Sequence, residues 1–477
     1  MITFFICLAA LVLAYFLYGG FLSRVVKLES SAEVPSKRLY DGVDYMPLPR
    51  WRIFLIQLLN IAGTGPIFGA ILGACYGPVA FLWITLGGIF MGAMHDFVAG
   101  VISLRNDGMS LPETIGKYLG GGMRKFSLVV IPILMILVGG VFIVTPSKIL
   151  TSMTDLPYLM WVGVIIIYYF VATVLPVDKI IGKIYPIFGF ALIFMAVSMF
   201  AVILFGDYQI PELTSLDNMH FNADKLPIVP TLFISIACGA ISGFHATQSP
   251  LMARCVTNEQ QSRPIFFGAM ISESIIALIW AAVAMAFFGG VEGLNTFMAE
   301  NGSDAGLAVS TISVTTLGMV GSILALLGVV AAPITSGDTA FRSARLIVAD
   351  MLHIEQRTLW KRLAVSAPLF AIGVGIAFID FDVIWRYFAW SNQTLAVFTL
   401  WMITAWLYRR HSKYSFVALI PAILMTYICA SFLFVSNQFV GMGACDAAYV
   451  YGGAVTAVIS AAAMLKIRKD VKNGAEI

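Results

Sequence analysis

Apolar runs long enough to cross a lipid bilayer follow one another from residue 2 to residue 465. A transmembrane helix needs about 20 mostly apolar residues. Thirteen runs, separated by charged or Pro- and Gly-rich segments, meet this need at residues 2–22, 51–75, 79–104, 126–147, 159–176, 184–206, 228–250, 264–290, 318–341, 363–379, 384–407, 415–436 and 446–465. Of the 477 residues 60% are hydrophobic and 12% are charged, a balance foreign to water-solvated proteins. The sequence therefore predicts an all-α polytopic membrane protein with about 13 transmembrane helices.

The basic residues predict how these helices are oriented. Cytoplasmic connections carry an excess of Lys and Arg. With the amino terminus outside and the carboxyl terminus in the cytoplasm, 26 of the 29 Lys and Arg residues fall on the cytoplasmic side, and the exceptions are Lys148, Lys225 and Arg386. The outer connections are acidic instead, at residues 207–224 and 292–304.

Several functional classes find no support in the sequence. The six cysteines form no C-x-x-C pair, so neither a structural zinc site nor a disulfide framework is predicted. No phosphate-binding loop, H-E-x-x-H motif or G-x-S-x-G elbow is present. A net charge of +3 is too small to indicate nucleic-acid binding. We predict a protein that is not an enzyme, has no catalytic residues, metal or cofactor, and has a small-molecule substrate and the lipid bilayer as partners.

Two of the predicted spans carry an interruption. Residues 61–66 read Ile-Ala-Gly-Thr-Gly-Pro in the second span, and the seventh span contains Gly, Ser and Pro between residues 239 and 250. Gly and Pro release backbone polar groups that lipid cannot satisfy. Because the spans that carry the two breaks start five spans apart, the breaks occupy corresponding positions in two halves of opposite orientation, as a five-plus-five inverted repeat requires. The alternative is a simple kink filled by a neighbouring helix.

This repeat divides the chain into five parts. They are an added amino-terminal helix with a cytoplasmic loop (1–50), the first inverted repeat (51–206), an extracytoplasmic loop (207–227), the second inverted repeat (228–407), and two carboxyl-terminal helices with a cytoplasmic tail (408–477). The polar segment 306–317 is predicted to be a re-entrant or surface piece that does not cross.

Ionisable residues inside the spans are few, and each is costly in hydrocarbon unless it faces a partner or a cavity. The candidates for a proton relay are His95, Asp96, His245, Glu273 and Asp338. For Asp338 the alternative is an i, i+4 ion pair with Arg342, and for His245 a structural hydrogen bond. Because neighbours on a helix are about 100° apart, His95 and Asp96 are expected to point in different directions.

The breaks also supply the expected binding residues. Half-helix amino termini favour an anionic group, so substrate is expected to contact Ala62, Gly63, Thr64, Gly65, Gly239, Ser242, Gly243, His245, Thr247 and Gln248. A coupling cation is expected at Ala62, Gly65, Thr335, Ser336 and Asp338. For the two hydroxyls the alternative is a hydrogen bond to the preceding helical turn.

Six motifs resemble those of the carbon starvation protein A (CstA) family of bacterial membrane transporters. They lie at residues 41–45, 61–69, 94–97, 105–108, 242–246 and 335–345. The resemblance implies uptake of peptides or pyruvate across a bacterial inner membrane, with proton coupling for the pyruvate carriers. It also implies the amino acid-polyamine-organocation superfamily and a LeuT-like fold, in which spans two, seven and nine are the first, sixth and eighth core helices.

We therefore expect a proton symporter that imports a small carboxylate nutrient, such as pyruvate or a short peptide. One alternative is a sodium-coupled amino acid or peptide symporter. Two others belong to different classes: a passive channel lined by the breaks, and an intramembrane metalloenzyme built on His95, Asp96 and His245. The sequence leaves the substrate, the coupling ion and the oligomeric state open.

Overall fold

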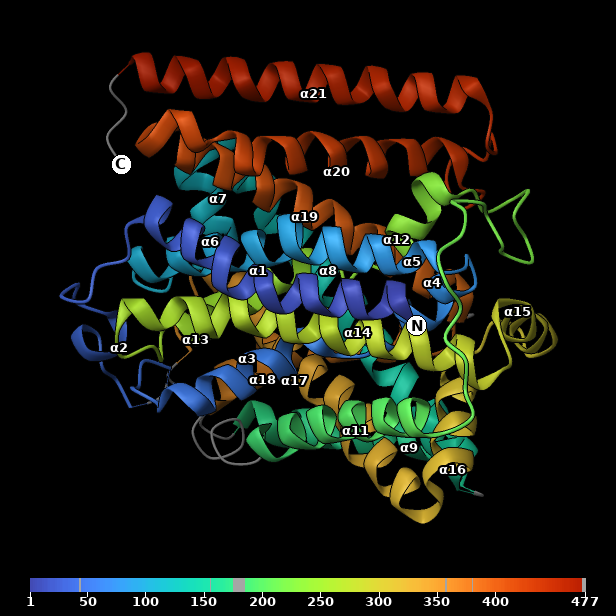
Figure 1. The fold of residues 1–477 in the computed structure, drawn as a ribbon. Coiled ribbons are helices and arrows are strands. Elements are labelled where there is room, and N and C mark those ends of the chain that lie inside the picture. Colours follow the sequence, from blue (N-terminus) through green and yellow to red (C-terminus); the bar gives the residue numbers. More distant parts are fainter. Residues whose placement is uncertain (43, 155, 175–184, 357, 380, 474–477) are drawn as a thin grey trace.

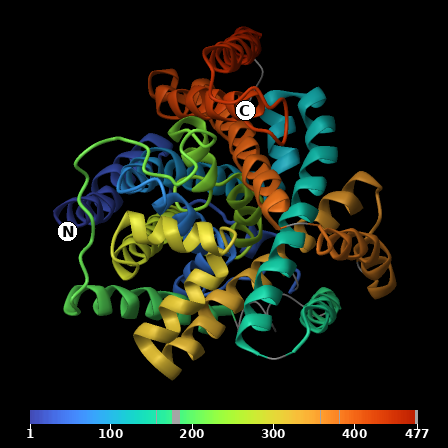
Figure 2. The ribbon, with the colours of Figure 1, turned by 90° about the vertical axis from the view of Figure 1, so that its right-hand side faces the viewer.

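The protein is all-helical over the part of the chain that the structure describes. The computed structural model describes residues 1–42, 44–154, 156–174, 185–356, 358–379 and 381–473, and within these ranges the backbone alone of residues 322, 325, 326, 381, 382, 411 and 412. The helices run side by side, with α20 and α21 at one edge in both views (Figures 1 and 2).

The first half of the chain begins with a long helix and continues through a broken one. Its elements are α1 (Ile2–Val26), α2 (Pro35–Arg38), α3 (Arg50–Ala62), η1 (Gly65–Gly69), α4 (Ala70–Ala74), α5 (Val79–Leu82), η2 (Trp83–Ala93), α6 (Met94–Arg105), α7 (Leu111–Leu119), α8 (Gly121–Met153), α9 (Tyr158–Val174) and α11 (Tyr185–Phe205).

The second half again starts with a broken helix. Its elements are η3 (Ile228–Leu232), α12 (Phe233–Ser235), α13 (Gly243–Ala253), η4 (Glu259–Gln261), η5 (Arg263–Phe267), α14 (Gly268–Phe287), α15 (Val291–Glu300), α16 (Ala305–Leu324), η6 (Ala325–Val330), α17 (Ala331–Met351), α18 (Leu359–Ile376), α19 (Phe381–His411), η7 (Ser412–Tyr414), α20 (Phe416–Val435) and α21 (Asp446–Lys472).

The two halves pack in the same way. Helix α3 packs on α11 as α13 packs on α19, and α8 packs on α9 as α17 packs on α18. Across the halves, α13 lies on α6 as α3 lies on α14, while α8 and α17 share the most extensive contact in the chain. These pairings are those of two repeats related by a pseudo-two-fold axis.

All thirteen predicted spans fall on helical structure, although the adjoining ends of the fifth and sixth lie outside the described residues. By length and apolarity, eight of the described helices can cross a membrane, or ten if each of two bent pairs counts as one span. Helix α9 is too short for this criterion, and α17 carries Asp338, Arg342 and Arg345. The two chain ends lie at opposite ends of the helices (Figure 1), as an odd number of crossings requires.

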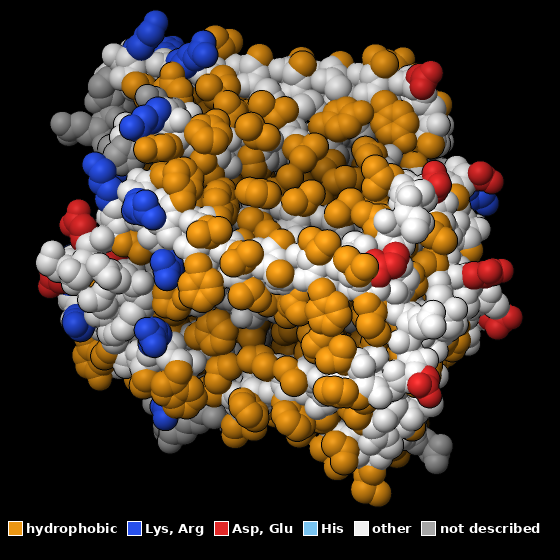
Figure 3. Space-filling view, viewed as in Figure 1, with side chains coloured by type: hydrophobic (Ala, Val, Ile, Leu, Met, Phe, Trp, Pro, Cys, Tyr) orange, Lys and Arg blue, Asp and Glu red, His pale blue; other side chains and the backbone are white. Residues whose placement is uncertain are grey.

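Charge divides the surface along the helix direction. Most Lys and Arg side chains gather at one end, where a few Asp and Glu side chains also lie, Asp and Glu predominate at the other end, and an apolar band separates the two ends (Figure 3). We call these the basic end and the acidic end. Such a band between two polar surfaces is the expected exterior of a membrane protein. Which end faces the cytoplasm remains a prediction.

The acidic end is covered by a helical pair and a long connection. Helix α15 and residues 305–321 of α16 meet at 120°, and α16 turns again at Gly318, where φ is 55° and ψ is −134°. This pair contains the polar segment 306–317. The connection 206–227 is tied down by Asn295 of α15, whose side-chain amide donates to the Met219 carbonyl at 2.8 Å and to the Cys75 carbonyl at 3.0 Å.

Candidate functional site

The first break lies between α3 and η1. Helix α3 ends because Gly63 has φ 46° and ψ −133°, a conformation that a side chain disfavours. A Cβ atom at this position would lie 2.8 Å from the ring of Phe142. Residue 63 must therefore be glycine for two reasons: the backbone turn disfavours a side chain, and the Phe142 ring leaves no space for one. The two arms of the broken helix meet at 55°.

The second break, residues 236–242, separates α12 from α13. Asn392 of α19 forms hydrogen bonds at the end of this break that adjoins α13. The Asn392 side-chain oxygen accepts a hydrogen bond from the Ser242 hydroxyl at 3.0 Å and another from the Phe244 backbone N–H at 2.8 Å. A side chain from another helix thus satisfies one of the amides left free at the start of α13. Gly243 packs against the α19 backbone, where a Cβ would lie 2.2 Å from the Ala396 nitrogen.

The two breaks touch each other. A Cβ placed on Gly65 would lie 2.1 Å from the Cβ and 2.3 Å from the Sγ of Cys238. One turn further along, a Cβ on Gly69 would lie 2.9 Å from the Ser235 carbonyl oxygen. The described conformation therefore brings the interrupted segments of the two halves into direct contact.

A buried carboxylate and histidine cluster lies beside the second break. The carboxylate of Asp96 accepts at 2.8 Å from Nδ1 of His95 and at 2.8 Å from Nδ1 of His245, while Nε2 of His245 lies 3.4 Å from Oε2 of Glu273. All four side chains are fully buried. The expectation that His95 and Asp96 point apart is wrong, because both side chains bend toward each other along α6.

Hydrogen bonding in this cluster is incomplete. Neither oxygen of Glu273 has a hydrogen-bond partner among the described residues, and Nε2 of His95 has none either. In proteins generally, burying an ionised carboxylate without a hydrogen-bond partner costs several kcal/mol. A proton bound at Glu273 would remove this cost.

The side chains of the other predicted substrate residues differ in whether their polar atoms have hydrogen-bond partners. The Thr247 hydroxyl donates to the Phe244 carbonyl at 2.7 Å, and the Gln248 amide donates to the Thr247 hydroxyl at 2.9 Å. The side-chain oxygens of Thr64 and Gln248 are buried, and no described residue gives either of them a hydrogen bond. Gly239 packs against Ala277 of α14. The predicted substrate residues thus gather around the two breaks, and their role in binding remains untested.

At the predicted cation site, the side chains bond to protein groups. The Thr335 hydroxyl donates to the Ala332 carbonyl at 2.8 Å, the alternative weighed from the sequence. The Ser336 hydroxyl donates across to the Leu59 carbonyl at 3.0 Å, which joins α17 to the end of α3. Asp338 accepts from the Tyr185 hydroxyl at 2.8 Å.

The predicted ion pair of Asp338 is present but long. Its carboxylate lies 3.9 Å from the Arg342 guanidinium, which also donates to the Ala172 carbonyl at 3.0 Å. The hydroxyl of Tyr185 is therefore the nearer partner of Asp338.

Sequence reasoning missed several polar residues of this region. Asn392 and Tyr185 lie about 150 residues from their partners, and no local pattern marks them. Gln57 and Asn60, one turn apart on α3, are fully buried, and their side-chain amides have no partner among the described residues. Two amides in an otherwise apolar span are a signal that a search confined to ionisable residues overlooks.

Two side chains of the cluster, together with Cys238 of the second break, have the chemistry of a metal site. Ligand atoms of Cys238, His245 and Glu273 all lie within 4.8 Å of one another. Thiolate, imidazole and carboxylate together suit Zn²⁺ or a similar transition ion. The prediction that the chain has no metal site is therefore open to test.

Aromatic rings fill the space on the acidic side of the breaks. Ring centroids lie 6.2 Å apart for Phe68 and Trp385, 5.3 Å for Trp385 and Phe388, and 6.0 Å for both Phe388–Phe142 and Phe142–Phe244. We call these five residues the aromatic layer. Since Phe142 covers Gly63, the layer reaches the first break.

Comparisons with known proteins agree with this architecture. The profile of the family described as "Carbon starvation protein CstA" matches residues 1–157 and 143–321. An uncharacterized membrane protein of Haemophilus influenzae is 40% identical over 350 residues, which is 62% of this chain and 93% of the relative.

Two named transporters are more distant. "Peptide transporter CstA" of Campylobacter jejuni is 26% identical over 463 residues, 81% of this chain and 62% of the relative. "Pyruvate/proton symporter BtsT" of Escherichia coli is 26% identical over 361 residues, 62% of this chain and 50% of the relative. The match thus spans about half to three fifths of the length of these transporters.

Solved structures share the fold at low sequence identity. A manganese transporter of Eremococcus coleocola superposes with a TM-score of 0.54 and 12% identity, covering 91% of this chain and 99% of that one. MhsT in complex with L-phenylalanine gives 0.56 and 12%, with coverage of 88% and 99%. The predicted LeuT-like, all-helical membrane fold is confirmed at this level.

Proposed function

The chain belongs to the CstA family of membrane transporters, and from this premise we propose that it is a proton symporter importing a small carboxylate nutrient, such as pyruvate or a short peptide. That it is a secondary transporter and not an enzyme follows from the family. The relatives named above are a peptide transporter and a pyruvate/proton symporter, which supports both candidate substrates.

One observation carries the coupling proposal. Asp96, His245 and Glu273 form a buried chain of two carboxyl groups joined by one imidazole, and this chain starts from the second break. A proton bound there changes the charge beside the proposed substrate site. Substrate affinity and protonation then depend on each other, which is the requirement for symport.

Uptake into proteoliposomes tests the proposal. Labelled pyruvate, dipeptides and amino acids are offered under an imposed proton gradient or an imposed sodium gradient. We expect accumulation driven by the proton gradient alone. Accumulation driven by sodium alone would favour the sodium-coupled alternative, and accumulation unaffected by collapse of both gradients would reject symport.

A substitution in the cluster separates coupling from translocation. Glu273→Gln keeps the size of the side chain and removes its titration. We expect uphill accumulation to be lost, while exchange of labelled for unlabelled substrate across the membrane continues. Glu292→Gln is the matched control, because Glu292 is exposed on α15 at the acidic end. Loss of exchange together with accumulation would contradict a role limited to coupling.

We also propose that the acidic end faces outward in a bacterial inner membrane. Cys445, in the connection between α20 and α21 at this end, is exposed, while the other five cysteines are buried. An impermeant maleimide should therefore label Cys445 in intact cells. Labelling only after the membrane is opened would reverse the orientation.

A second candidate cargo or ligand is a transition-metal ion at Cys238, His245 and Glu273. Metal analysis of purified protein tests it. A stoichiometric ion that is lost in Cys238→Ser would favour this candidate, and its presence in both proteins would place the ion elsewhere.

A further inference from the structure

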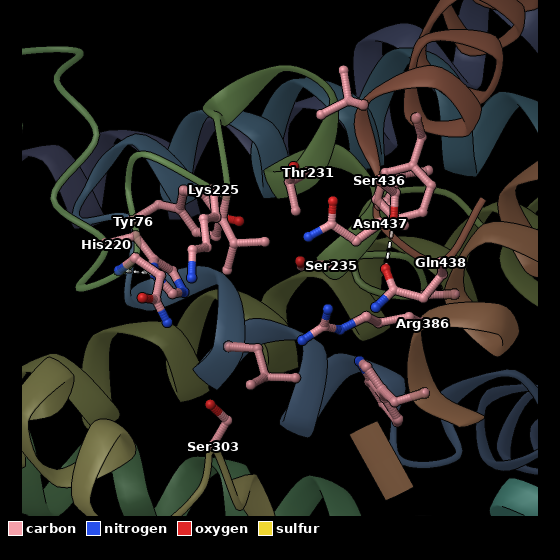
Figure 4. Close-up of a pocket in the computed structure, with 18 of the residues that line it drawn as sticks. Tyr76, His220, Lys225, Thr231, Ser235, Ser303, Arg386, Ser436, Asn437 and Gln438 are labelled. Carbon is pink, nitrogen blue, oxygen red and sulfur yellow. Dashed lines mark hydrogen bonds between the residues drawn. The ribbon is translucent and has the colours of Figure 1, made fainter. Parts of the chain in front are cut away.

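A cavity of about 190 Å³ lies at the acidic end, directly beyond the breaks (Figure 4). Three residues of its wall, Leu72, Ile234 and Ser235, belong to α4 and α12, the arms that lead into the two breaks. Trp385 of the aromatic layer also lines it. Trp385 and the close approach of Gly69 to Ser235 thus lie between this cavity and the breaks.

The charge of this cavity opposes the charge of its surroundings. Among the described residues only three basic ones, Lys148, Lys225 and Arg386, belong to the acidic end, and two of them, Lys225 and Arg386, line this one cavity. No acidic residue occurs among the described residues of its wall. A cleft lined by one sign of charge concentrates ions of the other sign.

The two cations approach the cavity from different elements. In Figure 4 the Arg386 guanidinium reaches into the cavity from α19, and Lys225 enters from the connection on the other side. Arg386 is half-buried, and no described acidic side chain lies within ion-pair distance of either residue. A guanidinium offers paired donors that match a carboxylate.

Neutral donors complete the wall. Burial lowers the pKa of His220 to about 4, so this imidazole is uncharged at neutral pH. Its Nδ1 accepts the Asn222 N–H at 3.0 Å, which leaves the proton on Nε2. The Tyr76 hydroxyl is buried near the hydroxyls of Ser235 and Thr231, and it has no hydrogen-bond partner among the described residues. A buried hydrogen-bond donor without a partner is uncommon in protein structures.

We propose that this cavity is an outer binding site that captures one carboxylate group of an arriving solute through Arg386 and Lys225, before the aromatic layer opens. The volume equals roughly six water molecules at about 30 Å³ each, which suits a small acid or one end of a short peptide. This inference rests on the proposed function and adds the chemical class that is recognised first.

Transport kinetics test the inference. Arg386→Gln and Lys225→Gln should each raise the KM for carboxylate uptake by at least about tenfold, with the maximal rate within about twofold of the wild type, and Arg386→Lys should recover part of the loss. Lys148→Gln is the matched control, because Lys148 is basic and at the same end but does not line the cavity. An unchanged KM in both Gln variants would overturn the inference while leaving symport intact.

A rival role for Arg386 is pairing within α19. Asp382 lies four residues earlier in the sequence, the spacing of a helical ion pair. If that pairing were the role of Arg386, Asp382→Asn would raise the KM as Arg386→Gln does. We expect Asp382→Asn to leave the KM unchanged.

A binding measurement that needs no transport tests this inference separately from the proposed function. Acetate should raise the melting temperature of the detergent-solubilised wild type, acetamide should not, and the acetate effect should disappear in Arg386→Gln. That result would support the outer site even if no carboxylate proved to be transported. Equal protection by acetamide, or greater protection by inorganic phosphate, would overturn the assignment to carboxylates.

Discussion

Gly65→Ala perturbs the contact between the two breaks directly. The added Cβ would lie 2.1 Å from the Cys238 Cβ, whereas ordinary contacts begin at 3.4 Å, so the segments must separate by about 1.3 Å (3.4 − 2.1). Overpacking of this kind costs about 1–3 kcal/mol. The cost falls on conformations in which the breaks touch, so those in which they part gain population by about 5- to 150-fold.

The native Cys238 reports this shift. Its side chain is 2% exposed, so a maleimide reaches it only when the breaks separate. Site-resolved mass spectrometry should show Cys238 alkylated about 5- to 150-fold faster in Gly65→Ala than in the wild type. Buried Cys429 and exposed Cys445 serve as internal references.

Matched variants identify the clash. Gly163→Ala on α9 should change nothing, since no atom lies within 4 Å of its added Cβ. The melting temperature lost in Gly65→Ala should return when Cys238→Gly is added, but not with Cys238→Ala, which keeps the clashing Cβ. Alkylation at the wild-type rate together with an unchanged melting temperature in Gly65→Ala would refute the reasoning.

Three further predictions concern single contacts. Asn392→Ala removes two hydrogen bonds at the second break and should destabilise the protein by about 1–3 kcal/mol in denaturant unfolding; no change would mean that water replaces the amide. Tyr185→Phe leaves Asp338 with only the 3.9 Å contact to Arg342 and should cost a similar amount, and an unchanged melting temperature would contradict this. Because the pKa of His220 falls from 6.5 to about 4 on folding, the unfolded chain binds more protons in this interval; the melting temperature should fall as pH drops from 6.5 toward 4, and less so in His220→Gln.

Local composition was enough to predict the breaks. Gly63, Gly65 and Pro66 interrupt an apolar run within four residues, and the backbone groups that they release need partners that lipid does not supply. The repeat followed from the positions of the two interruptions, because the spans between them set their relative direction. His245 was identified for the same reason, although the structure places it in the first turn of α13, next to the break and not inside it.

Contacts between distant segments could not be predicted in this way. Asn392 lies in a long helix 150 residues from Ser242, and nothing around it indicates which helix end it satisfies. The directions of His95 and Asp96 were mispredicted because Cα spacing does not fix where flexible side chains meet. The outer cavity depends on how the connection 206–227 folds across the acidic end, which no periodicity records.

The aromatic layer has a consequence for solute size. Each of its rings touches the next, so rotation of Trp385 obliges Phe388 to move, and Phe388 in turn obliges Phe142 to move. Passage between the outer cavity and the first break therefore requires these rings to change rotamer together, in addition to any separation of Gly69 from Ser235. Shortening one ring, as in Phe388→Leu, should then widen the range of solutes admitted without altering the fold.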